Sequence, residues 1–236
     1  MKLSMWIVYD WLQDYHPTAH IREGRQTITG VRYMADDVEL RQEYLYIGSG
    51  DQYIDHLENN VICVNETDLI VLSAPDIYVI FNEIQKMLEY YNRWETGIMQ
   101  ELNSEKELSW YLEQAAPVMK TGLAVSDLSH KAICHAAFQH QDEKLQLYQE
   151  FLKPEEMQIV NRQMQKHAGD RHPYIVQSSE DKDILFNLYS RNGSLMACLV
   201  SLSGGEGQGA ASRLQLMEVF GKLLNLWFLI HEDGLA

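Results

Sequence analysis

The chain has 236 residues and a formal charge of −15, from 34 acidic and 19 basic side chains. This length gives one large domain or two small ones, and 46% apolar residues are enough for a folded core. An acidic surface repels phosphate groups, so the composition argues against direct binding to nucleic acid or to anionic membranes. No apolar run approaches the roughly 20 residues of a transmembrane helix.

The three cysteines, Cys63, Cys134 and Cys198, lie far apart and form no C-x-x-C pair. This usage predicts buried thiols in a reducing compartment, with neither a disulfide framework nor a zinc site. The apolar start of the chain is broken by Asp10 and has no small-residue cleavage site, unlike a signal peptide. We therefore expect a cytoplasmic protein.

The first 75 residues predict a small α/β domain. Apolar residues at helical spacing predict a helix over 3–15, which ends before Pro17. Short apolar runs predict the strands that follow, and "NETD" predicts a hairpin turn between the last two. The predicted strands cover 28–34, 44–47, 61–64 and 69–73.

Residues 76–104 predict one long connecting helix with Asp76 as its N-cap. Its apolar residues repeat every seven positions, at Ile77, Ile84, Tyr91 and Ile98. Such a repeat indicates a seam against another helix, which makes these four residues a candidate homodimer interface. The alternative is an amphipathic helix that packs on its own domain.

Residues 105–236 predict a second domain, which makes the chain α+β. Helices are expected over 105–119, over 144–168 with a break at Pro154, and from a capping box at Ser212 and Gln215 to about Ile230. Strands are expected within 122–136 and over 174–178, 183–190 and 194–202, the last two joined by an Asn192-Gly193 turn. Because the last strand is apolar on both sides, we expect it at the centre of the sheet.

The stretch "SLSGGEGQGAAS" contains Gly205, Gly207 and Ala210 in the spacing G-x-G-x-x-A, which dinucleotide-binding folds use to approach a pyrophosphate. That fold also needs a parallel strand after the next helix, for which the 236 residues leave no room. A P-loop needs Lys-Ser/Thr after the glycines, and none follows. We therefore expect a connecting loop and no cofactor.

No set of residues in the sequence predicts catalysis or a metal site. His130, His135 and His140 are spaced by five, which fits no single helical or strand face. Nothing combines a nucleophile, a base and an oxyanion hole. We therefore expect a protein that is not an enzyme, with a dinucleotide-dependent enzyme as the weakest alternative.

Two regions resemble known families. The stretches "MKLSMWIVYDWL", "ITGVRYMADDVELRQEYLYIGSG" and "NNVICVNETDLIVLSAPDIYVIFNEIQKMLEYYNRWE" resemble the amino-terminal region of PucR-type (purine-catabolism-regulator-like) bacterial transcription regulators. Residues 105–232 resemble a GAF-type sensor domain, an architecture shared with PAS domains. The resemblance implies the sensor region of a cytoplasmic regulator, whose carboxy-terminal helix-turn-helix, the part that binds DNA, is absent from this chain.

Two mechanisms follow for such a region. In the first, a small-molecule effector enters between the sheet and segment 139–173 and shifts the flanking helices. Strand alternation makes His135, Asn187 and Tyr189 inward candidates and places Tyr174 at the rim, with a core role for each as the alternative. In the second, the domain binds nothing and is a dimerisation scaffold.

Overall fold

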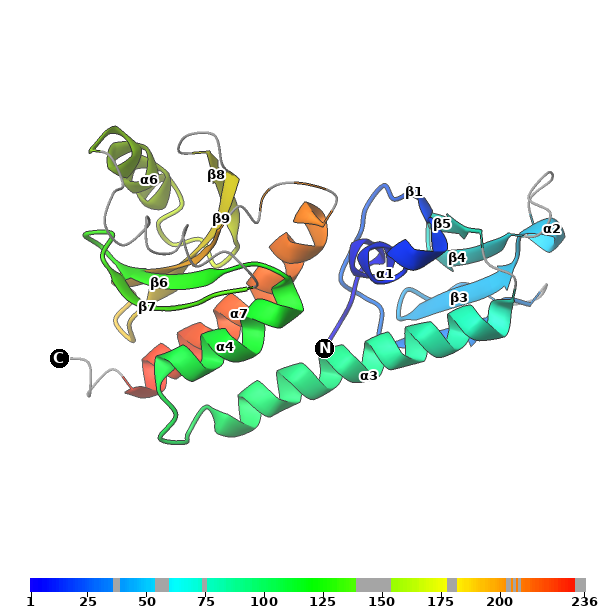
Figure 1. Ribbon diagram of the computed structural model, residues 1–236, viewed down its shortest axis with the longest axis horizontal. Helices are drawn as coiled ribbons and strands as arrows, with labels where there is room; N and C mark the ends of the chain where they lie inside the picture. The colour runs from blue at the N-terminus through cyan, green and yellow to red at the C-terminus, as the bar shows by residue number, and fades with distance from the viewer. Residues whose placement is uncertain are drawn as a thin grey trace. The chain divides into compact units, whose positions relative to one another are not determined.

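The computed structural model describes residues 1–35, 39–53, 60–73, 76–138, 154–177, 182–202, 205, 207 and 209–231 (Figure 1). The chain divides into two compact units, Met1–Glu95 and Thr96–Ala236, each with one five-stranded sheet. The α+β class expected from the sequence is confirmed. The division at residues 75 and 104 stays a prediction. No helix of the described chain combines the length and the apolar character needed to cross a bilayer.

The sheet of the first unit has the strand order β1-β5-β4-β3-β2. Only β2 and β3 run parallel, and the other neighbours are antiparallel. The elements are α1 (Met5–Trp11), a 3-10 turn (Gln13–Tyr15), β1 (Thr18–His20), β2 (Gly30–Tyr33), β3 (Tyr44–Ser49), α2 (Gly50–Tyr53), β4 (Val61–Asn65), β5 (Asp68–Leu72) and α3 (Ile77–Glu101).

The helix cap and the hairpin turn of the first unit form as the sequence predicts, whereas the length of the first helix and the presence of β1 differ from the prediction. Asp76 caps α3 by accepting a hydrogen bond from the Tyr78 N–H at 2.8 Å. The "NETD" turn joins β4 to β5, with Glu66 at a φ of 51°. The first helix is shorter than predicted because it stops at Trp11 and a separate 3-10 turn follows. Strand β1 was missed because its three residues show no apolar alternation.

The second unit holds an antiparallel sheet with the order β7-β6-β10-β9-β8. Strand β10 lies at its centre, as its two apolar sides predict. Residues 144–153 of one predicted helix lie outside the described residues. The elements are α4 (Leu108–Met119), β6 (Leu123–Asp127), β7 (Ala132–Ala136), α6 (Pro154–Lys166), β8 (Tyr174–Gln177), β9 (Lys182–Tyr189), β10 (Leu195–Ser201) and α7 (Ala210–His231).

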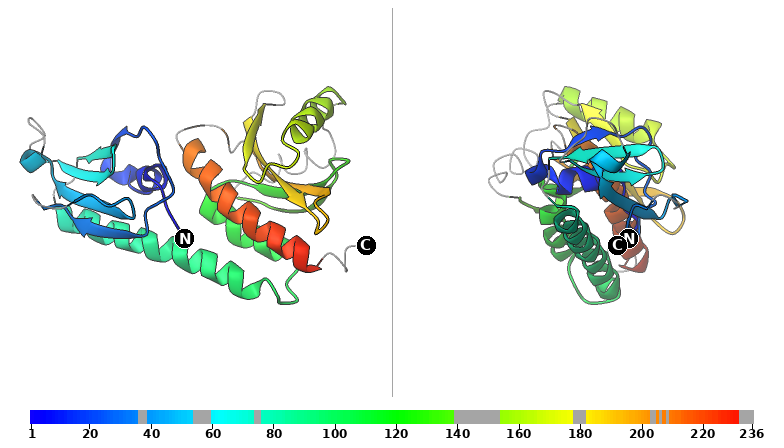
Figure 2. Two further views of the ribbon diagram at one scale, coloured as in Figure 1. Left: turned by 180° about the vertical axis from the view of Figure 1, so that it is seen from behind. Right: turned by 90° about the vertical axis from the view of Figure 1, so that its right-hand side faces the viewer.

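Helices cover both faces of this second sheet (Figure 2). Helices α4 and α7 pack together on one face, where Phe186 of β9 lies against Gly221 of α7. Helix α6 covers the opposite face, where Val160 and Met164 pack on Leu185, Cys198 and other buried residues. Residues of β9 therefore alternate between two covered faces, with Phe186 towards α7 and Leu185 towards α6.

Helix α7 begins two residues earlier than the sequence predicted, so the expected capping box is wrong. The carbonyl of Gly209 accepts the first helical hydrogen bond from the Arg213 N–H, at 3.0 Å, which places the helix start at Ala210. Ser212 is buried inside the first turn, where its hydroxyl donates to the same Gly209 carbonyl at 2.9 Å. The hydroxyl is thus engaged inside the helix and caps nothing.

Candidate functional site

Three of the four predicted ligand residues lie together, on the α6 side of the second sheet. Asn187 and Tyr189 alternate along β9, and Tyr174 of β8 lies opposite Leu185 of the same strand. The Tyr174 hydroxyl donates to Asn187 Oδ1 at 2.7 Å, and the Asn187 side chain is buried. We call Tyr174, Asn187 and Tyr189 the polar cluster.

The polar cluster binds the carboxy-terminal end of α6. Asn187 Nδ2 donates to the carbonyl of His167 at 3.1 Å and lies 3.4 Å from that of Met164. The His167 ring stacks on Tyr174 with 4.1 Å between the ring centroids. The His167 carbonyl also accepts from the Asp170 N–H at 3.0 Å, so Asn187 adds a second hydrogen bond at the end of α6.

Tyr189 binds the turn that follows α6. Its hydroxyl accepts a hydrogen bond from the Gly169 N–H at 2.9 Å. The same hydroxyl lies 3.2 Å from the carbonyl of Asp170 and 3.4 Å from that of His167, to one of which it donates. The backbone N–H of Tyr189 donates to Asn225 Oδ1 of α7 at 2.6 Å. Tyr189 thus contacts α7 through its backbone and the α6 turn through its side chain.

Burial keeps the interior beside the polar cluster uncharged. Desolvation raises the pKa of Tyr174 well above its usual range, and the nearby Cys198 and Tyr189 raise it further. Burial also raises the pKa of Cys198 to about 12. The phenol and the thiol are therefore both protonated at neutral pH and act as hydrogen-bonding groups without charge.

His135, the fourth predicted ligand residue, lies apart from the polar cluster. It is exposed on β7, the edge strand at the opposite side of the sheet from β8, where it pairs with Ala124 of β6. The structure therefore brings together Tyr174, Asn187 and Tyr189 and leaves His135 outside that group. A ligand role for any of the four stays a prediction.

A groove of about 190 Å³ opens beside Tyr189, between β9, α7 and the turn before β8. Strand β8 begins at Tyr174, opposite Leu185, so the last residues of β9 run beyond it and the 167–172 segment lies next to them. We call this hollow the α7 groove. It is lined by Arg171, Phe186, Tyr189, Lys222, Asn225, Leu226 and Leu229.

The polar groups of the α7 groove that still lack a partner are donors. Asn225 Oδ1 already accepts from the Tyr189 N–H, whereas the amide Nδ2 has no partner in the described part of the chain. Arg171 has no hydrogen bond or ion pair within the described part of the chain. Lys222 forms an ion pair with Glu218, with 2.5 Å between Nζ and Oε1. None of the seven described lining residues is acidic.

No pattern in the sequence indicated Arg171, but the spacing of residues along α7 indicated the helical part of the groove. Lys222, Asn225, Leu226 and Leu229 follow the spacing i, i+3, i+4, i+7, which places them on one face of the helix. A mixed polar and apolar stripe on so apolar a helix indicates a surface with a role beyond the core.

The predicted seam of α3 is mostly buried within a single chain. Ile84 is fully buried, Tyr91 and Ile98 are nearly so, and Ile77 is half-buried. Inside the first unit, Trp11 packs on Tyr91 with 6.0 Å between ring centroids. This is the packing expected of a helix on its own domain, and the homodimer interface stays a prediction.

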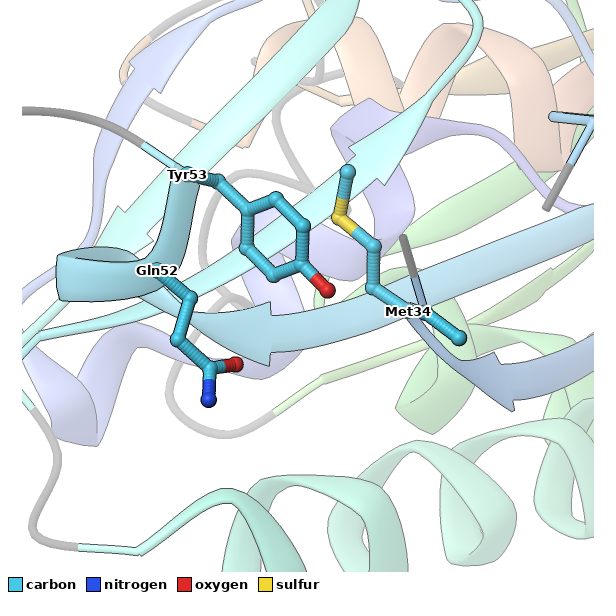
Figure 3. A pocket seen from close by; sticks show the side chains of 4 residues that line it. Met34, Gln52 and Tyr53 are labelled. Carbon is cyan, nitrogen blue, oxygen red and sulfur yellow. The ribbon is translucent and has the colours of Figure 1, made fainter. Parts of the chain in front are cut away.

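A second hollow, of about 430 Å³, lies in the first unit and is lined by Met34, Ala35, Gln52 and Tyr53. Figure 3 shows the Tyr53 ring beside the Met34 side chain, with Gln52 extending away from both. Both Met34 and Tyr53 lie close to Gly48, where a Cβ atom would come within 2.9 Å of the Tyr53 ring. The described residues that line the hollow offer an amide and a phenol but no charged side chain.

Backbone conformation and close packing explain why glycine stands at positions 205 and 207 of the 201–212 loop, without a bound cofactor. Gly207 has a φ of 70°, and the Gly205 N–H donates to the Lys182 carbonyl at 2.8 Å. A Cβ at Gly205 would lie 3.0 Å from that carbonyl oxygen. The strand before the loop has antiparallel neighbours on both sides, whereas dinucleotide-binding folds use parallel strands.

No family model and no curated protein matches this sequence. Among solved structures, a domain spanning residues 129–302 of a protein assigned to the IclR family of transcriptional regulators is similar to this chain. The similarity covers 56% of this chain and 93% of that domain, at 9% sequence identity and a TM-score of 0.33.

Proposed function

We propose that the chain is the sensory region of a transcription regulator, in which a small-molecule effector binds to the second unit. The observation that carries the proposal is the position of Tyr189. Tyr189 lines the α7 groove, its hydroxyl bonds the turn after α6, and its backbone N–H bonds Asn225 of α7. A ligand that contacts this residue therefore acts on two helices on opposite faces of one sheet.

The mechanism follows from these hydrogen bonds. An effector in the groove favours the arrangement in which Tyr189 and Asn225 keep their present positions, because it contacts both. This arrangement holds the 167–170 turn through the Tyr189 hydroxyl. The effector thereby shifts the population of α6 and α7 arrangements, and these helices pass the change to a DNA-binding domain outside these residues.

The family resemblance and the charge support the regulatory part of this proposal. The GAF-like order of elements fits a sensor, and the PucR-like first unit fits a regulator of the same class. A net charge of −15 assigns DNA binding to another part of the regulator, because this surface repels phosphates. Under this proposal the protein is cytoplasmic and has no catalytic role.

A thermal-shift screen of the full chain against a metabolite library tests the proposal. We expect at least one metabolite to raise Tm, because a ligand that binds only the folded state stabilises it. Tyr189→Phe removes the hydroxyl that bonds the α6 turn and should reduce the shift. Tyr78→Phe, on the exposed surface of α3, is the matched control and should leave it unchanged. A library in which no metabolite raises Tm would contradict effector binding.

The dimerisation scaffold is the second candidate, favoured by exposed apolar side chains on α3. Val79 and Met99 are 38% and 53% exposed. Because Ile84 is fully buried within its own chain, Ile84→Glu would test folding, whereas Val79→Lys with Met99→Lys tests association. A dimer in light scattering that these two changes convert to a monomer would support the scaffold. A monomeric wild-type chain would contradict it.

A further inference from the structure

We infer that the α7 groove selects small anions, namely molecules with a carboxylate or phosphate head on a compact apolar body. This inference rests on the proposed function, which requires an effector but does not specify its chemistry. The inference follows from the hydrogen bonds that the described lining residues already make and from the donors that they leave available.

The head of such a ligand is specified by the donors. The acceptors of the groove are already engaged, because Asn225 Oδ1 binds the Tyr189 N–H and the Tyr189 hydroxyl binds the α6 turn. Among the described residues that line the groove, the side-chain groups without a partner are the Arg171 guanidinium and the Asn225 amide Nδ2. An arginine fork and an amide donor match the oxygens of a carboxylate or a phosphate.

The body of the ligand is specified by the apolar lining. Phe186, Leu226 and Leu229 form the remaining walls, and Leu226 is 46% exposed. A volume of about 190 Å³ fits a single ring or a short alkyl chain but not a nucleotide. A ligand with an apolar body covers the exposed Leu226 side chain, which a bare inorganic anion cannot do.

Charge around the groove favours an anion in an otherwise acidic protein. Glu218 lies next to the lining, where it binds Lys222 and, at 3.2 Å, His172. The Lys222 charge is thus already compensated. Arg171 is therefore the residue that makes the groove prefer an anion to a neutral ligand. Asn225 positions the anionic head of that ligand.

Titration of the 236-residue chain with benzoate, phenyl phosphate and benzyl alcohol, followed by NMR, tests the inference. The signals to follow are the Asn225 side-chain NH₂ and the Tyr189 backbone N–H. We expect benzoate or phenyl phosphate to shift both signals in a saturable way. Neutral benzyl alcohol should bind about tenfold or more weakly, since it lacks the charge that Arg171 recognises.

Two arginine variants separate recognition from general charge effects. Arg171→Gln should weaken anion binding about tenfold or more, while Arg162→Gln makes the same charge change on the exposed surface of α6 and should leave it unchanged. Equal binding of benzyl alcohol and the anions, equal binding to the Arg171→Gln chain, or no binding of either anion would overturn the inference. If neutral metabolites raise Tm in a manner that depends on Tyr189 while both anions fail to bind, the inference fails and the proposed function stands.

Discussion

Phe186 of β9 lies directly against Gly221 of α7, so closely that a Cβ atom on Gly221 would come within 2.5 Å of the Phe186 ring. No side chain fits at that distance without moving the ring or the helix. This contact fixes the spacing between α7 and the sheet. Because Phe186 also lines the α7 groove, the same contact sets the position of one groove wall.

Gly221→Ala should therefore lower the free energy of unfolding by about 2 kcal/mol, since overpacking exceeds the gain of about 1 kcal/mol in helix propensity. Gly97→Ala is the matched control, because Gly97 lies inside α3, where an added Cβ would meet nothing within 4 Å apart from its chain neighbours and its own helix backbone. That change should stabilise the chain by up to about 1 kcal/mol. Urea unfolding of both variants measures the difference, and a Gly221→Ala chain as stable as wild type would contradict this packing.

Asn187→Leu should destabilise the second unit by about 2 kcal/mol or more. The change leaves the buried Tyr174 hydroxyl without its acceptor, and it removes the amide donor from the His167 carbonyl, which keeps its bond from the Asp170 N–H. Asn161→Leu, on the exposed surface of α6, should change stability by less than about 0.5 kcal/mol. Equal unfolding midpoints for the two variants would show that the polar cluster does not hold α6.

The turn between β6 and β7 makes stability depend on pH through Asp127. Its carboxylate accepts hydrogen bonds from the Ser129 hydroxyl and from the backbone N–H groups of Ser129 and Lys131, which lower its pKa below 3.8. A lowered folded-state pKa stabilises the protein above the unfolded-state pKa, and this stability is lost as pH falls through the folded value.

Asp127→Asn should therefore be less stable than wild type by about 1 kcal/mol at pH 7, a modest value because the site is partly exposed. The difference should shrink as the pH falls below 3.8. Denaturant unfolding at several pH values measures it. A difference that is constant with pH would show that the carboxylate charge contributes nothing.

The cysteines should be unreactive while the chain is folded. Burial raises the pKa of Cys63, Cys134 and Cys198 to about 12 in each case, so the thiolate population at pH 8 is very small. A colorimetric thiol reagent should label none of the three within minutes in buffer and all three in denaturant. Rapid labelling of the native chain would show that one of these sites opens.

Local and periodic signals in the sequence predicted much of the fold. The two apolar sides of β10 placed it at the centre of its sheet, and alternation placed Asn187 and Tyr189 on one face. The α7 groove could not be predicted in this way, because it depends on the proximity of Arg171 and Lys222, which lie 51 positions apart in the sequence. The capping box at Ser212 failed because Gly209 already provides the helix start.

Hydrogen exchange at the Gly169 amide tests the central claim, that Tyr189 couples the α7 groove to the α6 turn. This amide donates to the Tyr189 hydroxyl at 2.9 Å. With the groove saturated by phenyl phosphate, its exchange should slow about fivefold or more in the wild-type chain and not in Tyr189→Phe. Saturation of the Asn225 side-chain signal with no change in exchange at Gly169 would contradict the coupling.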